Sequence, residues 1–366
     1  MAQEVRKANG LSLDFIFHPG DTLAEVLEDR NMTQTELALR TSVSKKHISS
    51  IVSGKKDISI SFAKKLEYAL DIEAQFWINL QSNYDREILE YNEANSITEE
   101  ELDVLNRLKE VIRDFKLFGI IDPDANNSEK VLALRSILNI SNLCSIPKLA
   151  EAAAFRIQDS VRVDPYILFA WQKLCELSTE DVALDYLLDI QQLNESLEDI
   201  KSLMFKNPNV MRKELKEILG KCGIKFEIVP NYTGAPVQGY IKNDNGQLLL
   251  CMTIRGKYSD VFWFTLFHEL GHIVNGDTTN TFIDFKASAN MAELKADEFA
   301  KNTLLDAELY NDFVMKGKYN SIQEIKKLAS ACNVEPFIVI GRLMKEELID
   351  WGDFKPYRKK YEWGKE

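Results

Sequence analysis

His268-Glu269-Leu270-Gly271-His272 ends an apolar run that begins at Phe262, and the run predicts a helix over about residues 259 to 274. Two imidazoles four residues apart on a helix share one face and can bind the same metal ion. Glu269 lies between them, where a water molecule activated by the metal would lie. The chain has four histidines in all, so chance explains this spacing poorly. The pentapeptide therefore predicts a metal site.

Two histidines do not complete a catalytic zinc site, which takes three protein ligands and one open position. No histidine follows His272, so the third ligand is expected to be a carboxylate. In the helical segment 293 to 300, Glu293 and Asp297 share a face at i and i+4. We expect Glu293 to bind zinc and Asp297 to accept a hydrogen bond from a ligating histidine. The residues that would let the two helices approach closely are Gly271, Ala296 and Ala300. The simpler alternative is two partly buried, hydrogen-bonded imidazoles without a metal.

A β pattern precedes the metal helix. Residues 224 to 229 alternate in hydrophobicity with a period of two, and residues 237 to 242 and 247 to 254 also resemble strands. Asn245-Gly246, between the last two, is a strong hairpin signal. We expect a small sheet directly before the metal helix, with a peptide substrate adding as a strand near Leu248 to Ile254.

The segment from Tyr258 through Ala300 resembles the ImmA/IrrE family of glutamate-zincin metallopeptidases, whose members cleave repressor or regulator proteins. The resemblance is specific over about residues 223 to 304 and weaker elsewhere. It implies that His268, His272 and Glu293 hold zinc and that Glu269 is the catalytic base. The group that stabilises the oxyanion remains open, and the candidates are Tyr258, Arg255 and Arg342.

A second unusual stretch lies near the N-terminus. Between Leu37 and Lys56 there is no acidic residue, although acids outnumber bases in the chain. Capping residues predict one helix from Thr33 through Arg40 and another from Ser44 to about Val52. The basic residues of this stretch are Arg40, Lys45, Lys46, His47, Lys55 and Lys56. Two short helices joined by a tight turn could present them to the major groove of DNA. A helical bundle with a solvated basic face is the alternative.

The run from His18 to Asp85 is similar along its length to the Xre-type helix-turn-helix of HigA-family antitoxins. The motifs that carry the similarity are His18-Pro19-Gly20, Met32-Thr33-Gln34 and the closing Phe76-Trp77 with Asn79-Leu80-Gln81. Members of that family bind double-stranded operator DNA, usually as dimers, and often bind a toxin. Carried over by position, the DNA-binding candidates are Gln34, Lys45, Lys46, His47 and Ser49.

Composition limits the remaining possibilities. A chain of 366 residues with 45% hydrophobic and 28% charged residues suggests two or three globular domains. Its net charge of -12 argues against general polyanion binding, so any DNA contact must be local. No apolar stretch approaches the roughly 20 residues of a membrane helix, and the polar residues 1 to 7 lead us to expect no secretion signal. Five widely spaced cysteines predict no disulfide framework, and we expect a cytoplasmic protein without a membrane partner.

These observations predict a mainly α protein with a small β-sheet. The expected parts are a helix-turn-helix domain (1–95), a helical connecting region (96–222), an α+β zincin-like core (223–305) and a C-terminal helical region (306–366). The predicted function is an antitoxin-type transcriptional regulator, a homodimer on operator DNA. Its zinc endopeptidase domain would cleave a regulator or partner protein. The alternative is a non-catalytic antitoxin or repressor whose C-terminal domain binds a toxin or ligand, with zinc only structural.

Overall fold

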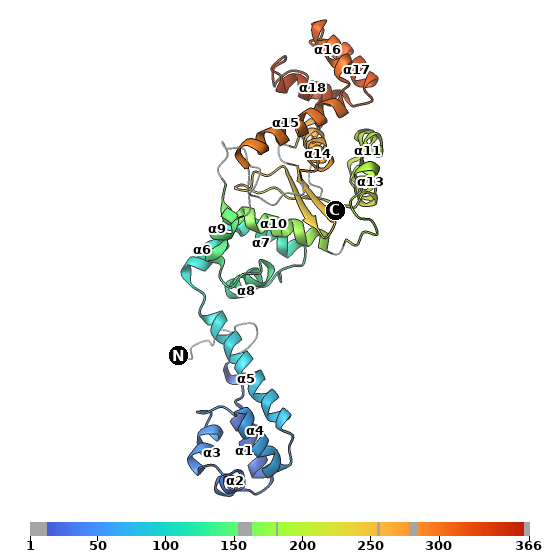
Figure 1. The fold of residues 1–366 in the computed structure, drawn as a ribbon. Coiled ribbons are helices and arrows are strands. Elements are labelled where there is room, and N and C mark those ends of the chain that lie inside the picture. The colour runs from blue at the N-terminus through green and yellow to red at the C-terminus, as the bar shows by residue number, and fades with distance from the viewer. Residues whose placement is uncertain (1–12, 153–162, 181, 255–256, 278–284, 362–366) are drawn as a thin grey trace. The chain divides into compact units, whose positions relative to one another are not determined.

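The computed structural model describes residues 13–152, 163–180, 182–254, 257–277 and 285–361 (Figure 1). The chain divides into two compact units, one of residues 1–106 and 116–144 and the other of residues 107–115 and 145–366. Within the described ranges the protein is mostly helical, with one three-stranded sheet, which confirms the predicted fold class. None of the described helices has the length and apolar character needed to cross a bilayer.

The first unit begins with a bundle of five helices. Their bounds are α1 Pro19–Asp29, α2 Gln34–Thr41, α3 Lys45–Val52, α4 Ile60–Leu70 and α5 Ala74–Asn95. The side chains of Thr33, Ser44 and Ser59 each accept the N–H three residues on, which fixes where α2, α3 and α4 begin. Ile48 and Ile51 of α3 are fully buried in the core of this bundle.

A buried ion pair joins the other two helices of this unit, α6 (Glu99–Arg107) and α8 (Asn127–Ile137). Glu101 is fully buried and accepts hydrogen bonds from Arg135 Nε at 3.1 Å and Nη2 at 2.6 Å. It also accepts the Leu143 N–H at 3.0 Å. Burial opposes the ionisation of Glu101, but Arg135 and the Leu143 N–H together hold its pKa below the usual value.

The second unit contains the sheet, which consists of β1 Ile224–Val229, β2 Gly239–Asp244 and β3 Gln247–Thr253. The strand order is β1-β3-β2, with β1 parallel and β2 antiparallel to β3. Asn245 and Gly246, at φ 53° and 87°, form the predicted hairpin turn. The predicted substrate edge near Leu248 to Ile254 is wrong, because β3 is the central strand and both its sides are paired. The sheet edge on that side is β2.

Helices cover both faces of the sheet (Figure 1). On one face lies α10 (Pro165–Glu180), where the Cys251 thiol contacts the Cys175 carbonyl oxygen and Trp171 Nε1 donates to Pro230 O. On the other face, α13 (Pro208–Lys221) and α14 (Ser259–Val274) bury apolar side chains against alternate strand residues such as Phe226 and Leu250. The alternation follows from the period of two in the strands.

The remaining helices surround this core. They are α7 Lys109–Leu117, α9 Ile146–Ala152, α11 Ile190–Glu195, α12 Leu197–Ser202, α15 Phe285–Leu304, α16 Ala307–Met315, α17 Ile322–Ala331 and α18 Pro336–Lys345. The C-terminal segment anchors the start of α14, because Lys359 O accepts the Ser259 N–H at 3.0 Å. Beside this contact Arg358 forms a buried ion pair with Asp260 at 2.8 Å. The first turn of α14 is thus fixed from outside the helix.

Candidate metal centre and nucleic-acid interface

Small residues hold α14 and α15 close together. Ala296 and Ala300 of α15 are fully buried. A Cβ atom added to Gly271 of α14 would lie 3.0 Å from Phe299 Cδ1 and 3.1 Å from Ala296 Cα. A side chain at position 271 would therefore fit only if the neighbouring atoms of α15 moved by a few tenths of an ångström. The close contact of the two helices lets short side chains on both of them reach a common point.

His268, His272 and Glu293 meet at that point. Their candidate ligand atoms all lie within 4.8 Å of one another. The two Nε2 atoms are 3.0 Å apart, Glu293 Oε2 lies 3.0 Å from His268 Nε2, and Glu293 Oε1 lies 3.5 Å from His272 Nε2. The structure therefore brings together the three residues predicted as metal ligands, from two helices that are separate in sequence. Whether they bind zinc stays a prediction.

A carboxylate orients each histidine ring. His268 Nδ1 lies 2.9 Å from Asp297 Oδ1, and His272 Nδ1 lies 3.1 Å from Asp277 Oδ2. A carboxylate accepts hydrogen bonds, so each Nδ1 carries the proton and each Nε2 turns toward the centre of the cluster. Histidines that bind metal ions are commonly oriented in this way by a second carboxylate or carbonyl.

The donor set fits a tetrahedral zinc ion. Nitrogen and oxygen ligands about 2.0–2.2 Å from such an ion lie about 3.3–3.6 Å from each other. The separations of His268 Nε2 from His272 Nε2 and from Glu293 Oε2, both 3.0 Å, are close to that geometry, and the other oxygen of Glu293, Oε1, lies 3.5 Å from His272 Nε2. Two imidazole lone pairs and a carboxylate directed at one point repel one another unless a positive charge lies between them. A divalent cation would supply that charge.

Without a metal, a second proton on the His268 ring supplies the positive charge. Burial acts against the charged form, but hydrogen bonds with Asp297 and Glu293 outweigh it and raise the pKa of His268 to about 9. The same contact with His268 lowers the pKa of Asp297, and Lys345 Nζ lies 3.5 Å from that carboxylate. The cluster is therefore electrostatically built to hold a cation at its centre.

Glu269, the predicted base, packs against the edge strand β2. A Cβ atom at Gly239 would lie 2.5 Å from Glu269 Oε1. The backbone of β2 can therefore lie against the carboxylate only because position 239 has no side chain. Any side chain at position 239 would displace Glu269. Gly239 could not be identified from the sequence, because nothing in its local pattern indicates which residue lies opposite it.

Asp277 is a second residue of the site that the helical spacing did not predict. It follows α14 in a helix-ending motif: the Gly276 N–H donates to Ile273 O and the Asp277 N–H donates to His272 O at 3.0 Å. Gly276 has φ 76°, the left-handed conformation that this motif requires. The turn brings Asp277 back onto the ring of His272. Asn275-Gly276, just after the last histidine, is the sequence signal that could have located this turn.

The structure places the candidates for stabilising the oxyanion differently. Arg255 lies outside the described residues. Arg342 interacts with other residues: its Nε donates to Glu346 at 2.9 Å, and its guanidinium lies 3.7 Å from the centre of the Tyr310 ring. The ring of Tyr258 lies under the Arg358 guanidinium, 3.9 Å from its centre. Within the described residues, neither Tyr258 nor Arg342 forms a hydrogen bond or ion pair with the histidine cluster, so the choice stays open.

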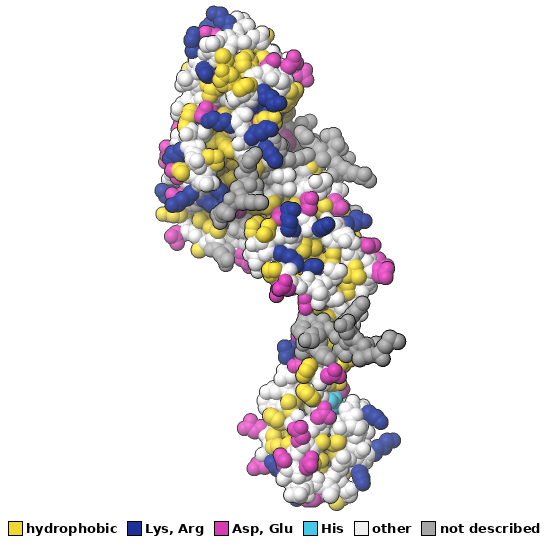
Figure 2. All heavy atoms as spheres, turned by 180° about the vertical axis from the view of Figure 1, so that it is seen from behind, with side chains coloured by type: hydrophobic (Ala, Val, Ile, Leu, Met, Phe, Trp, Pro, Cys, Tyr) yellow, Lys and Arg dark blue, Asp and Glu magenta, His cyan; other side chains and the backbone are white. Residues whose placement is uncertain are grey.

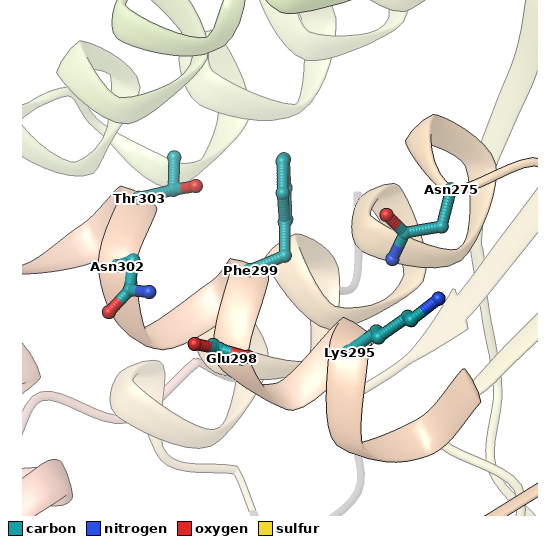
Figure 3. Close-up of a pocket in the computed structure, with 6 residues that line it drawn as sticks. All are labelled: Asn275, Lys295, Glu298, Phe299, Asn302 and Thr303. Carbon is teal, nitrogen blue, oxygen red and sulfur yellow. The ribbon is translucent and has the colours of Figure 1, made fainter. Parts of the chain in front are cut away.

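Another face of α15 borders a hollow of about 410 Å³. Figure 3 shows its lining residues, which are Asn275, Lys295, Glu298, Phe299, Asn302 and Thr303. In the helical repeat these α15 residues lie away from Glu293 and Asp297. The hollow is therefore separate from the metal cluster.

The predicted DNA-binding residues lie on α2 and α3. Gln34 is the first residue of α2, and Lys45, Lys46 and His47 form the first turn of α3. Lys45, Lys46 and Ser49 are exposed, whereas Gln34 and His47 are half-buried. In Figure 2, Lys and Arg side chains gather on one side of the α1–α5 bundle and acidic side chains on another. The contact of these residues with DNA stays a prediction.

Comparison with known proteins identifies this bundle. Residues 23–77 match the helix-turn-helix family, so the predicted N-terminal helix-turn-helix domain is confirmed. Similar solved structures include the antitoxin HigA of Pseudomonas aeruginosa with the higBA promoter (30% identity, 23% of this chain and 97% of that chain, TM-score 0.21). They also include a HigA-family antidote protein of Coxiella burnetii (26% identity, 23% and 96%, TM-score 0.21). A third is a Pseudomonas aeruginosa protein in complex with its operator DNA (35% identity, 20% and 80%, TM-score 0.20). No match was found among curated proteins.

Proposed function

We propose that this chain, which carries a helix-turn-helix domain at residues 23–77, is an antitoxin-type transcriptional regulator whose second unit is a zinc-dependent endopeptidase. The single observation that carries the enzymatic half is the convergence of His268, His272 and Glu293 within 4.8 Å. The regulatory half rests on the helix-turn-helix match and on the exposed cations of α3. The two halves are separate proposals and are tested separately.

The DNA-binding half follows from charge and helix position. The N-terminal turn of α3 presents Lys45 and Lys46 to solvent, and this is the part of a recognition helix that meets base edges. Gln34 starts α2, where side chain and helix N-terminus can together meet a backbone phosphate. We propose that the protein binds operator DNA as a homodimer, because paired half-sites match a twofold protein.

The peptidase half follows from the chemistry of the cluster. When bound, zinc supplies Lewis acidity toward a peptide carbonyl and toward water. His268, His272 and Glu293 would hold it, with Asp297 and Asp277 fixing the two rings. We propose that Glu269 takes the proton of the attacking water and returns it to the leaving amine, which is the task of a general base and acid.

The position of β2 supports an extended peptide as the substrate. β2 is an edge strand, and Gly239 brings its backbone against Glu269. An extended segment that pairs with this edge would carry its peptide groups past the carboxylate. We propose a regulator or partner protein, such as a cognate toxin, as the source of that segment.

Metal analysis tests the ligand set. Protein purified without chelator should contain about one zinc per chain, and His268→Ala should lose it. A wild-type protein that is folded and refuses zinc would overturn the assignment. Lys295→Ala, on the opposite face of α15, is the matched control and should keep the metal.

Glu269→Gln separates catalysis from structure. It removes the base and leaves the three ligands in place, so zinc should be retained while cleavage of a coexpressed partner protein stops. If zinc is only structural, this variant should behave as the wild type does. That result would favour the non-catalytic alternative, in which the second unit only binds a toxin or ligand.

Gel-shift titration tests the regulatory half. DNA from immediately upstream of the protein's own coding sequence should be bound in preference to a scrambled duplex of equal length, over a range of salt concentrations. Weak binding that is indifferent to sequence and abolished by salt would overturn it.

A further inference from the structure

Three contacts fix His47 at the start of α3, one at its backbone and two at its ring. The Ser44 side chain accepts the His47 N–H at 3.2 Å, which fixes the backbone. The imidazole meets the buried Phe62 ring edge to face, with centroids 5.0 Å apart. Lys56, in the loop after α3, places Nζ 3.0 Å from Nδ1 of the imidazole. The ring is therefore an oriented group and not a freely rotating one.

The contact with Lys56 decides which nitrogen carries the proton. A lysine ammonium has three donors and no acceptor, so Nδ1 must be the acceptor. The proton of the neutral ring then lies on Nε2. Burial lowers the pKa of His47, and the nearby charges of Lys56 and Lys65 lower it further. Burial and the two lysines thus favour the neutral ring, with Nε2–H as its donor.

The rest of the ring is available to a ligand. His47 is half-buried, and among the described residues Nε2–H meets no protein acceptor. The neighbouring Lys45, Lys46 and Lys55 are exposed charges that suit phosphate at any sequence. An oriented neutral donor is different, because it distinguishes acceptor from donor positions on a base edge.

We propose that Lys56 is a positioning residue that sets the Nε2–H tautomer of His47, and that His47 uses this donor to recognise N7 of a purine in the major groove. The inference rests on the proposed DNA binding and names the base atom that gives it specificity. It assigns Lys56 a role that differs from that of the adjacent Lys55. Both lysines are exposed and carry the same charge.

Nitrogen NMR of the free protein tests the tautomer without DNA. The full chain labelled with ¹⁵N-histidine gives four ring systems, and His47→Gln identifies the one from position 47. The unprotonated nitrogen of His47 should be Nδ1. Lys56→Met should yield a mixture of both tautomers, whereas Lys55→Met should leave the wild-type pattern. An unprotonated Nε2, or a pattern unchanged in Lys56→Met, would overturn the positioning role.

A purine scan tests the recognition. Duplexes selected by the full chain from a random pool are resynthesised with 7-deazapurine at one position at a time, which removes only N7. At one purine in each half-site the wild type should lose about tenfold in affinity. His47→Ala should be nearly insensitive to that replacement, and Lys56→Met should show a smaller penalty than the wild type, because only part of its His47 population carries the Nε2–H donor. Lys55→Met should keep the tenfold penalty.

The outcomes separate the inference from the function on which it rests. If Lys56→Met weakens binding equally to every duplex and keeps the tenfold penalty, Lys56 is only a phosphate contact and the inference fails. If the wild type selects no sequence, the proposed regulator function fails, and base recognition by His47 fails with it. The NMR result still decides the tautomer in that case.

Discussion

Adding one methyl group at Gly271 tests whether the close contact of α14 and α15 sets the geometry of the metal cluster. In Gly271→Ala the new Cβ would lie 3.0 Å from Phe299 Cδ1, 3.1 Å from Ala296 Cα and 3.2 Å from Ala296 O. These distances fall short by 0.2 to 0.4 Å of the 3.4 Å at which ordinary contact begins. Phe299 can turn aside, but the backbone of Ala296 can yield only if α15 moves.

The energetic terms have opposite signs. Alanine is better than glycine in a helix interior by about 1 kcal/mol. Overpacking a tight contact costs about 1–3 kcal/mol. We therefore expect the free energy of unfolding without metal to be unchanged or reduced by up to about 2 kcal/mol. No favourable term offsets the effect on metal binding, because Glu293 moves when α15 moves. Metal–ligand distances can vary by only about 0.2 Å from their usual values.

We expect the zinc affinity of Gly271→Ala to fall by about tenfold, which corresponds to about 1.4 kcal/mol. Competition titration against a chromophoric chelator measures this, and thermal unfolding of the metal-free protein measures stability. Gly352→Ala is the control, because nothing lies within 4 Å of the Cβ it adds. A stable Gly271→Ala protein with wild-type zinc affinity would refute the reasoning.

Three further results are expected. Glu101→Gln leaves Arg135 without its buried carboxylate and should lower the free energy of unfolding of the first unit by about 3 kcal/mol. Urea titration of the full chain measures this change. Because the folded pKa of Glu101 lies below its unfolded value of about 4.3, this contribution is present above that pH and lost as pH falls through the folded pKa. The difference in the free energy of unfolding between the wild type and Glu101→Gln should therefore become smaller in acid. A difference that does not depend on pH would contradict the ion-pair explanation. Asp277→Asn should weaken zinc binding about 10- to 100-fold in the chelator titration, and equal affinity would mean that the contact with His272 does not orient the ring. Gly239→Ala should reduce cleavage of a partner protein while zinc content stays at the wild-type level, since the three atoms nearest to the added Cβ all belong to Glu269. Loss of zinc in that variant would show that β2 supports the metal and not only the base.

Local patterns were sufficient for much of the fold. The caps at Thr33 and Ser44 predicted where α2 and α3 begin, because the side-chain oxygen satisfies a free N–H only at that position. Asn245-Gly246 predicted the β2–β3 turn because both residues tolerate positive φ. The apolar run before His268 predicted α14, residues Ser259 to Val274. Each of these signals is complete within a few residues of chain.

Pairing across the chain was not predictable in the same way. Strand order depends on which segments meet, so the sequence could not decide that β3 is central and β2 is the edge. A run from residue 187 to 204 reads as one apolar helical pattern, but the structure divides it into α11, α12 and a 3-10 turn. The break comes at Ser196, whose hydroxyl donates to the Gln192 carbonyl.

The candidate metal centre also has features that the sequence predicts and features that depend on tertiary packing. The sequence by itself determined that His268 and His272 share a helix face, because a helix repeats every 3.6 residues. The spacing of Glu293 and Asp297 likewise placed them on one face of α15. Only the tertiary structure decided that these two faces meet, through the absence of a side chain at Gly271. Only it brought Asp277 onto His272 and Gly239 against Glu269, because contacts between distant segments depend on packing and not on local periodicity.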